Sequence, residues 1–423
     1  MTLALGIDIG TSGVRTAVLE ADGSLLSSAR AAHVGQKGAA IDARDWWVAV
    51  ANCITAQVSA LGDLGRSGTE IGRIAIDGTS GSMVLTDEGL APVGPALMYN
   101  SKGFKDEAAL IAAQCPVEDH IAQGSNSALA RALRLRREAD AAPAHLLHQA
   151  DFIAATLMGH GGHSDHNNAL KTGFDPDASD WPDWIKELLG PALLPRVDAV
   201  GTVWDTLNPD VASSLGLSPN AQVCAGTTDS IAAFLAAAPL ESGAGVTSIG
   251  STLAIKVLSD KRIDLPAMGL YSHRVGDYWL VGGASNTGGA VLASFFTPDE
   301  LAQLSDQIDP SIASDLDYYP LLEPGERFPV NDPDLAPRLT PRPASDAEFL
   351  HGLFEGIATI EARCYALIKS KGGPTPLAIY TAGGASRNVT LKAIRERVLE
   401  RPLHMAAQTE ASIGSARLAQ GLI

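Results

Sequence analysis

The chain has 423 residues, and at roughly 100 to 200 residues per domain this length predicts two or at most three domains. With 48 Asp and Glu against 31 Lys and Arg, its net charge of −17 repels nucleic-acid backbones and anionic membrane surfaces. Hydrophobic residues at 46% and charged residues at 19% are typical of a globular protein and exclude a disordered chain.

Targeting and cysteine signals are weak. The N-terminal MTLALGIDIG has no basic region, and no apolar stretch reaches about 20 residues, so we expect a cytoplasmic protein without a membrane span. The cysteines show no CxxC spacing, which argues against a disulfide framework or a zinc cluster. We expect all four to be reduced and mostly buried: Cys53, Cys115, Cys224 and Cys364.

The first elements predict an α/β layer. The apolar run Leu3–Ile9 is followed by a Gly/Thr/Ser turn at residues 10–13 and by an alternating run at 14–19, which predicts a hairpin. A third strand at 24–31 completes a meander, and a helix is expected at about 45–61. The apolar strand at 74–76 then enters the polar loop DGTSG, so strand, helix and strand alternate.

The middle of the chain, about 104–217, is predicted to be helical and rich in loops. His160, His163 and His166 lie near Asp165 in a glycine-containing loop, which indicates either a metal site or, as we prefer, a substrate-contact loop. The arginine-rich stretch at 131–137 is predicted to be the solvated face of a helix.

The opening pattern returns after residue 221. A strand at 223–225 precedes Asp229 and a helix at 230–238, and two runs at 246–249 and 253–258 flank Gly-Ser-Thr. This repeat indicates a duplicated domain with a site in the cleft between the halves. A third block has a strand at 377–381, a double glycine and a helix at 388–399. The last helix, within 409–423, is predicted to start with a Thr-Glu N-cap pair.

The chemistry suggested by these turns is phosphate handling. The sequence contains no GxxxxGK[ST], GxGxxG, GxSxG or HExxH motif. Backbone amides and hydroxyls of the turns, with Thr11, Ser12 and Arg15, suit phosphate oxygens. Asp8 fits a metal ligand or an Asp that bonds its own turn. Asp229 fits a general base or an ordinary N-cap, and nothing local separates these readings.

Four ordered motifs resemble those of the FGGY carbohydrate kinases, relatives of actin, Hsp70 and hexokinase. They are LALGIDIGTSGVRTAVLEADG, CAGTTDS, VTSIGST and YTAGGASRN, and TEASIGSARLAQGL resembles the final helix of the family. The resemblance implies a two-domain α/β fold of the actin/Hsp70/hexokinase (ribonuclease H-like) type with a central cleft. It also implies a sugar-side domain, 1–236 plus 410–423, and a nucleotide-side domain, 237–409.

The resemblance also implies roles and cofactors, ATP and Mg²⁺. Asp229 would be the general base. Asp8 and Asp229 would hold Mg²⁺ together with ATP, and both would also contact the sugar. The residues expected to contact ATP come from both halves: Thr11, Ser12, Gly13, Arg15, Gly250, Ser251, Thr252, Gly288, Gly383, Gly384, Ala385 and Asn388.

The sugar loop favours D-ribulose. Residues 77–82 resemble the Asp-Ala-Thr-Cys-Ser pattern of ribulose-type kinases rather than the Gly-Gln-Met-His-Gly of xylulokinases, and Asp77 and Ser80 would contact the sugar. The chain resembles the compact ribulose kinase group of cyanobacteria and plants. Alternatives are a xylulokinase or another ketose or polyol kinase and, more remotely, an actin-like nucleotide switch. Expected partners are the sugar and ATP or ADP, with the protein as a monomer or homodimer.

Overall fold

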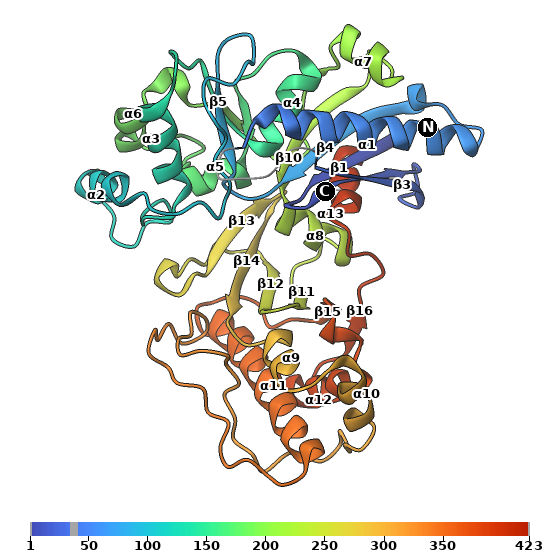
Figure 1. Ribbon diagram of the computed structural model, residues 1–423, viewed down its shortest axis with the longest axis vertical. Coiled ribbons are helices and arrows are strands. Elements are labelled where there is room, and N and C mark those ends of the chain that lie inside the picture. Colours follow the sequence, from blue (N-terminus) through green and yellow to red (C-terminus); the bar gives the residue numbers. More distant parts are fainter. Residues whose placement is uncertain (1, 34–40, 422–423) are drawn as a thin grey trace. The chain divides into compact units, whose positions relative to one another are not determined.

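The computed structural model describes residues 2–33 and 41–421 (Figure 1). The chain forms two compact units, each with its own sheet and core. Unit 1 comprises Met1–Ala236, Arg274–Gly276 and Gln408–Ile423, and unit 2 comprises Ala237–His273 and Asp277–Ala407. The assignment of one unit to the sugar and the other to the nucleotide stays a prediction.

Unit 1 is built on a six-stranded sheet. Its strands, in spatial order, are β3 (Leu25–Ala32), β2 (Gly13–Leu19), β1 (Leu3–Ile9), β4 (Ile71–Gly78), β10 (Gln222–Thr228) and β9 (Val203–Thr206). The expected meander is present, because β1 pairs antiparallel with β2 and β2 with β3. β4 is parallel to both β1 and β10, so the carboxyl ends of these three strands meet at one edge.

Unit 2 repeats this arrangement. The spatial order is β13 (Tyr271–Val275), β14 (Tyr278–Ser285), β12 (Leu253–Ser259), β11 (Ala244–Ile249), β15 (Ala378–Ala382) and β16 (Leu403–Met405). β11 is antiparallel to β12, as β1 is to β2, and parallel to β15, as β1 is to β4. β15 is in turn parallel to β16, as β4 is to β10. Five strands of each sheet therefore share one pairing pattern, as the repeated sequence motif predicts, and the sixth strand, β9 or β13, lies at opposite edges in the two units.

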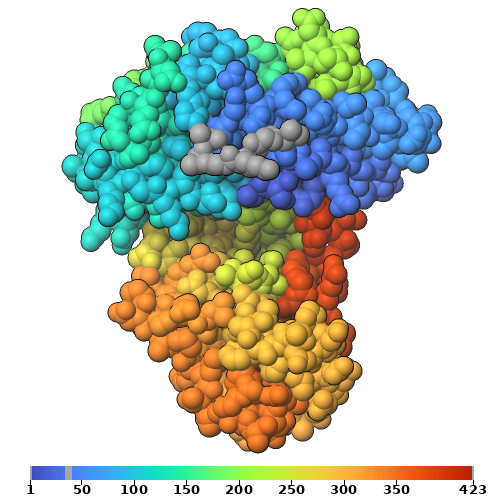
Figure 2. Space-filling model, in the orientation of Figure 1, coloured from blue at the N-terminus to red at the C-terminus, as the bar shows by residue number. Residues whose placement is uncertain are grey.

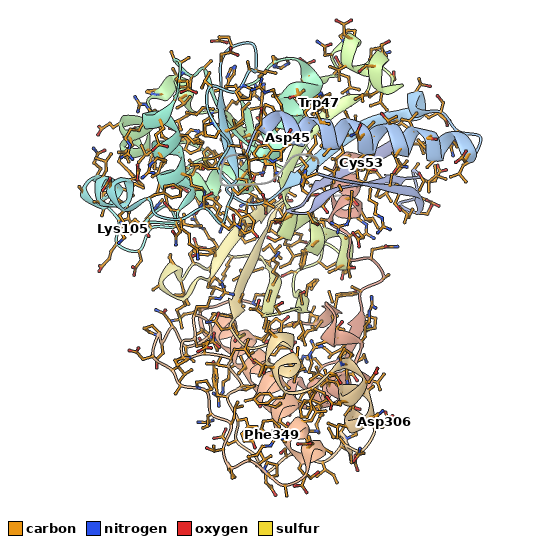
Figure 3. All side chains as sticks on the ribbon, in the orientation of Figure 1. Asp45, Trp47, Cys53, Lys105, Asp306 and Phe349 are labelled. Carbon is orange, nitrogen blue, oxygen red and sulfur yellow. The ribbon has the colours of Figure 1, made fainter. Side chains whose placement is uncertain are left out.

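Helices cover both faces of the sheet in unit 1. The long helix α1 (Ala43–Asp63) buries an apolar stripe that includes Cys53, labelled in Figure 3, and the thiol of Cys53 lies 3.6 Å from the Thr16 hydroxyl of β2. The C-terminal helix α13 (Ala411–Gln420) packs on β1, β2 and β4 (Figure 1). Residues from opposite ends of the chain consequently lie side by side in unit 1, as the blue and red surfaces of Figure 2 show.

The remaining elements fill the two units. In unit 1 they are β5 (Met83–Thr86), α2 (Lys105–Gln114), α3 (Ala128–Glu138), β6 (His145–His148), α4 (Gln149–Met158), β7 (His163–Asp165), α5 (His166–Thr172), α6 (Asp183–Leu189), β8 (Arg196–Asp198) and α7 (Pro209–Leu215). Helix α8 (Asp229–Ala237) follows β10 directly. Unit 2 adds α9 (Gly289–Phe295), α10 (Pro298–Ser305), α11 (Asp346–Ser370) and α12 (Val389–Leu399).

The core of unit 2 surrounds α11. Phe349, labelled in Figure 3, packs its ring against Phe295 and Tyr318, and the Arg342 guanidinium lies 3.6 Å from the centre of the Phe349 ring. Deeper in the core, the fully buried Arg395 of α12 forms a two-pronged ion pair with Glu361 of α11, at 2.6 and 2.8 Å. A buried pair of this kind is costly to break from one side, so it fixes how the two helices pack.

Two expectations about charged residues are wrong in part, although residues 136–138 of α3 are exposed as expected. Arg131 of α3 is not on a solvated face: it is 4% exposed and donates to the carbonyls of Gly81, Tyr99 and Asn126. Burial lowers the pKa of Arg131 to about 10. The Thr-Glu pair does not cap α13 through a side chain either: Glu410 is at the N-cap position, but its carboxylate pairs with Arg15. Tertiary partners outweigh the local patterns in both cases.

The cysteine prediction is confirmed: all four are free thiols, three are buried, and Cys115 is half-buried.

Across residues 2–33 and 41–421, no helix has both the length and the apolar character required to span a bilayer.

Close backbone packing of α13 gives a test of this fold. A Cβ at Gly414 would lie 1.8 Å from the Ala232 carbonyl oxygen of α8, so Gly414→Ala should lower the free energy of unfolding by about 3 kcal/mol. The matched control is Gly62→Ala in α1, where a Cβ meets nothing within 4 Å and should raise it by about 0.5 to 1 kcal/mol. Urea unfolding measures both. Equal stability of Gly414→Ala and the native protein would contradict the packing.

Candidate active site

Three carboxylates come together at the carboxyl ends of the three parallel strands of unit 1. Asp8 in β1 and Asp77 in β4 are at the same register, and Thr227 of β10 is opposite Asp77 on its other side. Asp229 begins α8 two residues later. Ligands of open α/β sheets bind outside the carboxyl ends of the strands, so this edge is the candidate active site.

Asp8 is nearly buried, at 5% exposed. Burial raises its pKa, while its interaction with Asp77 and the charge of Arg15 act in the opposite direction. Nη1 of Arg15 lies 3.3 Å from Oδ2 of Asp8, and its Nε lies 3.3 Å from Oε2 of Glu410. Arg15 therefore joins the Asp8 carboxylate to the start of α13.

Asp77 is fully buried, and the Ser415 hydroxyl of α13 donates to its Oδ2 at 2.6 Å. Burial first, and then the charges of Asp8 and Asp229, raise the pKa of Asp77 well above the usual value for Asp. A sugar contact by Asp77 stays a prediction, and it would require movement of the groups that cover this side chain.

Asp229 is half-buried and is the first residue of α8. Its Oδ1 accepts from the Ser230 amide at 2.6 Å. The charge of Asp229 also raises the pKa of Asp77, so the two carboxylates are close. The general-base and helix-cap interpretations of Asp229 both stay predictions.

The turn after β1 presents its hydroxyls to solvent. Thr11 and Ser12 are exposed, and the Gly10 amide donates to the Gly13 carbonyl at 3.0 Å, which closes the turn. Gly13 is buried, and a Cβ there would lie 2.4 Å from the Ala31 carbonyl oxygen. Of the residues expected to bind phosphate in unit 1, Arg15 contacts Asp8, and Thr11 and Ser12 follow Asp8 closely in the chain.

Polar atoms beside this edge are buried without a hydrogen-bond partner among the described residues. They are Ser80 Oγ, Asp77 Oδ1, Gln149 Nε2, Asn167 Oδ1 and Thr228 Oγ1. An unpaired buried polar atom costs free energy, and a ligand rich in hydroxyls is one way to satisfy it. Gln149 and Asn167 are new candidates: Gln149 Oε1 accepts from the Thr79 amide at 3.0 Å, and Asn167 Nδ2 donates to Thr227 Oγ1 at 3.0 Å.

Sequence reasoning missed both side chains. Gln149 has no local signal, because it starts α4 and approaches residue 79 only through the fold. Asn167 lies in the histidine-containing loop whose preferred interpretation was a substrate contact, and the polar dipeptide after His166 was the available signal.

The histidines themselves do not form a metal site. His160 contacts Asp205 at 2.9 Å, His163 lies 3.7 Å from Asp198, and His166 stacks on Phe174. Within the described part of the chain, no group of three or more His, Cys, Asp or Glu side chains is placed to hold a metal ion.

Unit 2 brings its predicted nucleotide residues together. The Gly289 amide donates to the Gly250 carbonyl at 2.8 Å, and the Ala290 amide donates to the Ser251 carbonyl at 3.1 Å. Gly288 has φ of 144°, and a Cβ there would lie 2.7 Å from the Thr252 carbonyl carbon. The Gly250–Thr252 turn and the start of α9 therefore pack through backbone, which glycine alone permits.

The third block lies beside this turn. A Cβ at Gly289 would lie 3.8 Å from Ala385 Cβ, and one at Gly383 would lie 2.4 Å from the Ile249 carbonyl oxygen. Gly384 is exposed next to them. Asn388 instead uses its amide internally: Oδ1 caps α12 at the Leu391 amide, and Nδ2 donates to Ser305.

The oxygen donors in unit 1 fit Mg²⁺. Asp8 and Asp229 supply carboxylates, the ligand type this ion prefers, and the ion usually takes one or two carboxylates together with substrate phosphates. Asp77 Oδ1 is a further buried carboxylate oxygen without a partner among the described residues. Because no three-residue metal group is preassembled in that part of the chain, the ion would arrive with the nucleotide.

The buried position of Asp77 predicts a pH effect on stability. A carboxyl whose pKa is raised on folding stabilises the folded state at low pH, and this contribution is lost as pH rises above the unfolded value of about 4. Asp77→Asn removes this ionisable group, so the free energy of unfolding of the variant relative to the native protein should rise as pH increases above about 4. Urea unfolding across that range tests it, and a difference that falls with pH would contradict the direction.

Comparisons with known proteins identify the family of this chain. The model of the N-terminal domain of the FGGY family of carbohydrate kinases matches residues 3–123, and that of the C-terminal domain matches residues 245–420. The chain is 25% identical to a xylulose kinase of Streptomyces coelicolor, over 100% of this chain and 88% of that protein. A xylulose kinase of Bacillus subtilis is 23% identical over 99% of this chain and 88% of its own.

Solved structures share the fold. A xylulose kinase of Rhodospirillum rubrum has a TM-score of 0.85 at 21% identity, with 99% of this chain and 89% of that chain covered. A glycerol kinase of Plasmodium falciparum, solved with ADP, has a TM-score of 0.85 at 14% identity, with 100% and 90% covered. The predicted two-domain α/β fold is therefore confirmed. Since both domain models match in order and together span more than half of the chain, the protein belongs to the FGGY family of carbohydrate kinases.

Proposed function

We propose that this kinase transfers a phosphoryl group from ATP to a ketopentose, with D-ribulose as the sugar and D-ribulose 5-phosphate as the product. The observation that carries the proposal is the group of three carboxylates, Asp8, Asp77 and Asp229, at one sheet edge beside unpaired polar atoms. The cytoplasm is the proposed location, and a monomer or homodimer is the proposed assembly.

In this proposal Asp229 is the general base. Its carboxylate takes the proton of the attacking sugar hydroxyl as the oxygen bonds to the γ-phosphorus and the bond to ADP breaks. Asp8 and Asp229 would hold Mg²⁺, which neutralises charge on the phosphates when bound. Thr11, Ser12 and Arg15 would donate to phosphate oxygens.

Residues of unit 2 are proposed to bind the nucleotide. Gly250, Ser251 and Thr252 would hold the transferred group through amides and hydroxyls, and Gly288 and Gly383 would allow the backbone to approach it. Gly384, Ala385 and Asn388 would line the adenosine pocket, with Asn388 exchanging its present contact with Ser305 for the nucleotide.

The choice of sugar depends on the loop after β4. Ser80 Oγ is buried and unpaired among the described residues, in a loop closed by Thr79 and Ser82 hydroxyls 2.6 Å apart. Arg131 holds the same loop through the Gly81 carbonyl. The resemblance of residues 77–82 to the pattern of ribulose-type kinases supports D-ribulose, whereas the two relatives that match nearly the whole chain are xylulose kinases and support D-xylulose as the second candidate.

A sugar panel tests the activity and the choice together. Release of ADP from MgATP should be fastest with D-ribulose among D-ribulose, D-xylulose, L-ribulose, glycerol and no sugar. A higher kcat/KM with D-xylulose would replace D-ribulose by the second candidate. If no sugar raised ADP release above the sugar-free rate, sugar phosphorylation would be rejected in favour of a nucleotide switch.

The base assignment has its own test. Asp229→Asn should lower kcat by roughly 10²- to 10⁴-fold, because the variant cannot accept the proton, while ATP binding measured by calorimetry persists. Asp210→Asn, at an exposed position of α7, is the matched control and should retain full turnover. Near-normal kcat in Asp229→Asn would refute the assignment.

A further inference from the structure

Two arginines face each other across the first two strands of the meander. Arg15 of β2 and Arg30 of β3 are directly paired in the antiparallel register, so their side chains leave the same face of the sheet, and both are exposed. Like charges in such a pair destabilise a sheet unless a counter-charge lies between them. A negatively charged group near the two guanidinium groups would therefore stabilise this pair of strands.

Carboxylates of the protein pair with only one of these two arginines. Arg15 is engaged by the carboxylates of Asp8 and Glu410. The Arg30 side chain makes no hydrogen bond or ion pair with any residue that the structure describes. The Arg30 guanidinium is therefore available to an external anion.

Both arginines line the same cavities. A pocket of about 340 Å³ is bounded by β2, β3 and the segment that begins α13, and its polar lining includes Arg15, Arg30, Ser28, Gln408 and Ser412. We call this the arginine pocket. A second hollow, of about 370 Å³, shares both arginines and reaches Ser12 and Gly13 of the turn after β1. The first volume is at the small end of the range for ligand sites, about 300 to 1,000 Å³.

The hydrogen-bond donors that line the arginine pocket favour an anionic ligand. Guanidinium groups form forked hydrogen bonds with phosphate, and hydroxyl and amide donors complete such a site. The one carboxylate in the lining, Glu410, already contacts Arg15 and is 57% exposed, so an anion would compete with it. A compact dianion matches this arrangement better than a neutral sugar does.

We propose that the arginine pocket is a second phosphate site, which binds inorganic phosphate or the phosphate group of a sugar phosphate between Arg15 and Arg30. Because Arg15 also contacts Asp8, the occupied pocket draws the guanidinium away from that carboxylate and links this site to the candidate active site. The site does not depend on which sugar the enzyme phosphorylates.

The test is a calorimetric titration with inorganic phosphate, in the absence of ATP and sugar and at constant ionic strength set with chloride. Arg30→Gln should weaken phosphate binding by roughly tenfold or more, the loss expected for one charged hydrogen-bonding partner. Glu410→Gln should strengthen binding, because it removes the competing carboxylate. Arg44→Gln, in an exposed pair with Asp42 on α1, is the matched control and should bind as the native protein does.

A second ligand distinguishes free phosphate from a sugar phosphate, and a conservative variant controls for misfolding. Tighter binding of D-ribulose 5-phosphate than of inorganic phosphate would identify a sugar phosphate as the ligand, and equal binding would identify free phosphate. Arg30→Lys keeps the charge and should retain part of the affinity, so loss of folding in Arg30→Gln does not end the test. Absence of phosphate binding, or equal affinity in native protein, Arg30→Gln and Glu410→Gln, would overturn the proposal, whereas the kinase activity is tested separately by the sugar panel.

Discussion

The parallel pairing of β1 with β4 places two carboxylates, Asp8 and Asp77, side by side in a largely buried position, and much of unit 1 is organised around this contact. Two ionised carboxylates so close together repel each other, and burial increases the cost of both charges. The structure balances this with Ser415, which donates to Asp77, and with Arg15, which contacts Asp8.

The last helix is consequently part of the candidate site. Ser415 lies 338 residues after Asp77 in the chain, and α13 reaches it by packing its glycine and alanine residues directly on β1 and α8. A Cβ at Gly6 would lie 1.9 Å from the Ser412 carbonyl oxygen, so the contact is between backbones. Close approach of this kind brings a short serine side chain within reach of a buried aspartate.

The two units share a fold but present different side chains at the ends of their strands. Five strands in each unit pair in the same way, and both units have turns rich in glycine, serine and threonine, but the strand ends of unit 1 bear carboxylates in addition. Carboxylates suit proton transfer and metal binding, and bare amides with hydroxyls suit anionic phosphates. The division of roles proposed for this kinase follows from that difference in side chains.

The sequence by itself determined the strand and turn elements, the repeat and the family motifs, because periodicity, glycine turns and motif order are local properties. Asp8, Asp77 and Asp229 were found this way, and the parallel strands then explain their proximity. The positions of Gln149, Asn167 and Arg131 were decided only by the tertiary structure. Their partners lie 32 to 70 residues away along the chain, except for the Asn126 carbonyl five residues before Arg131, and no local pattern specifies such contacts. The same is true of Arg15 and Arg30: the meander was predictable, but the register that sets one guanidinium against the other depends on how the two strands pair.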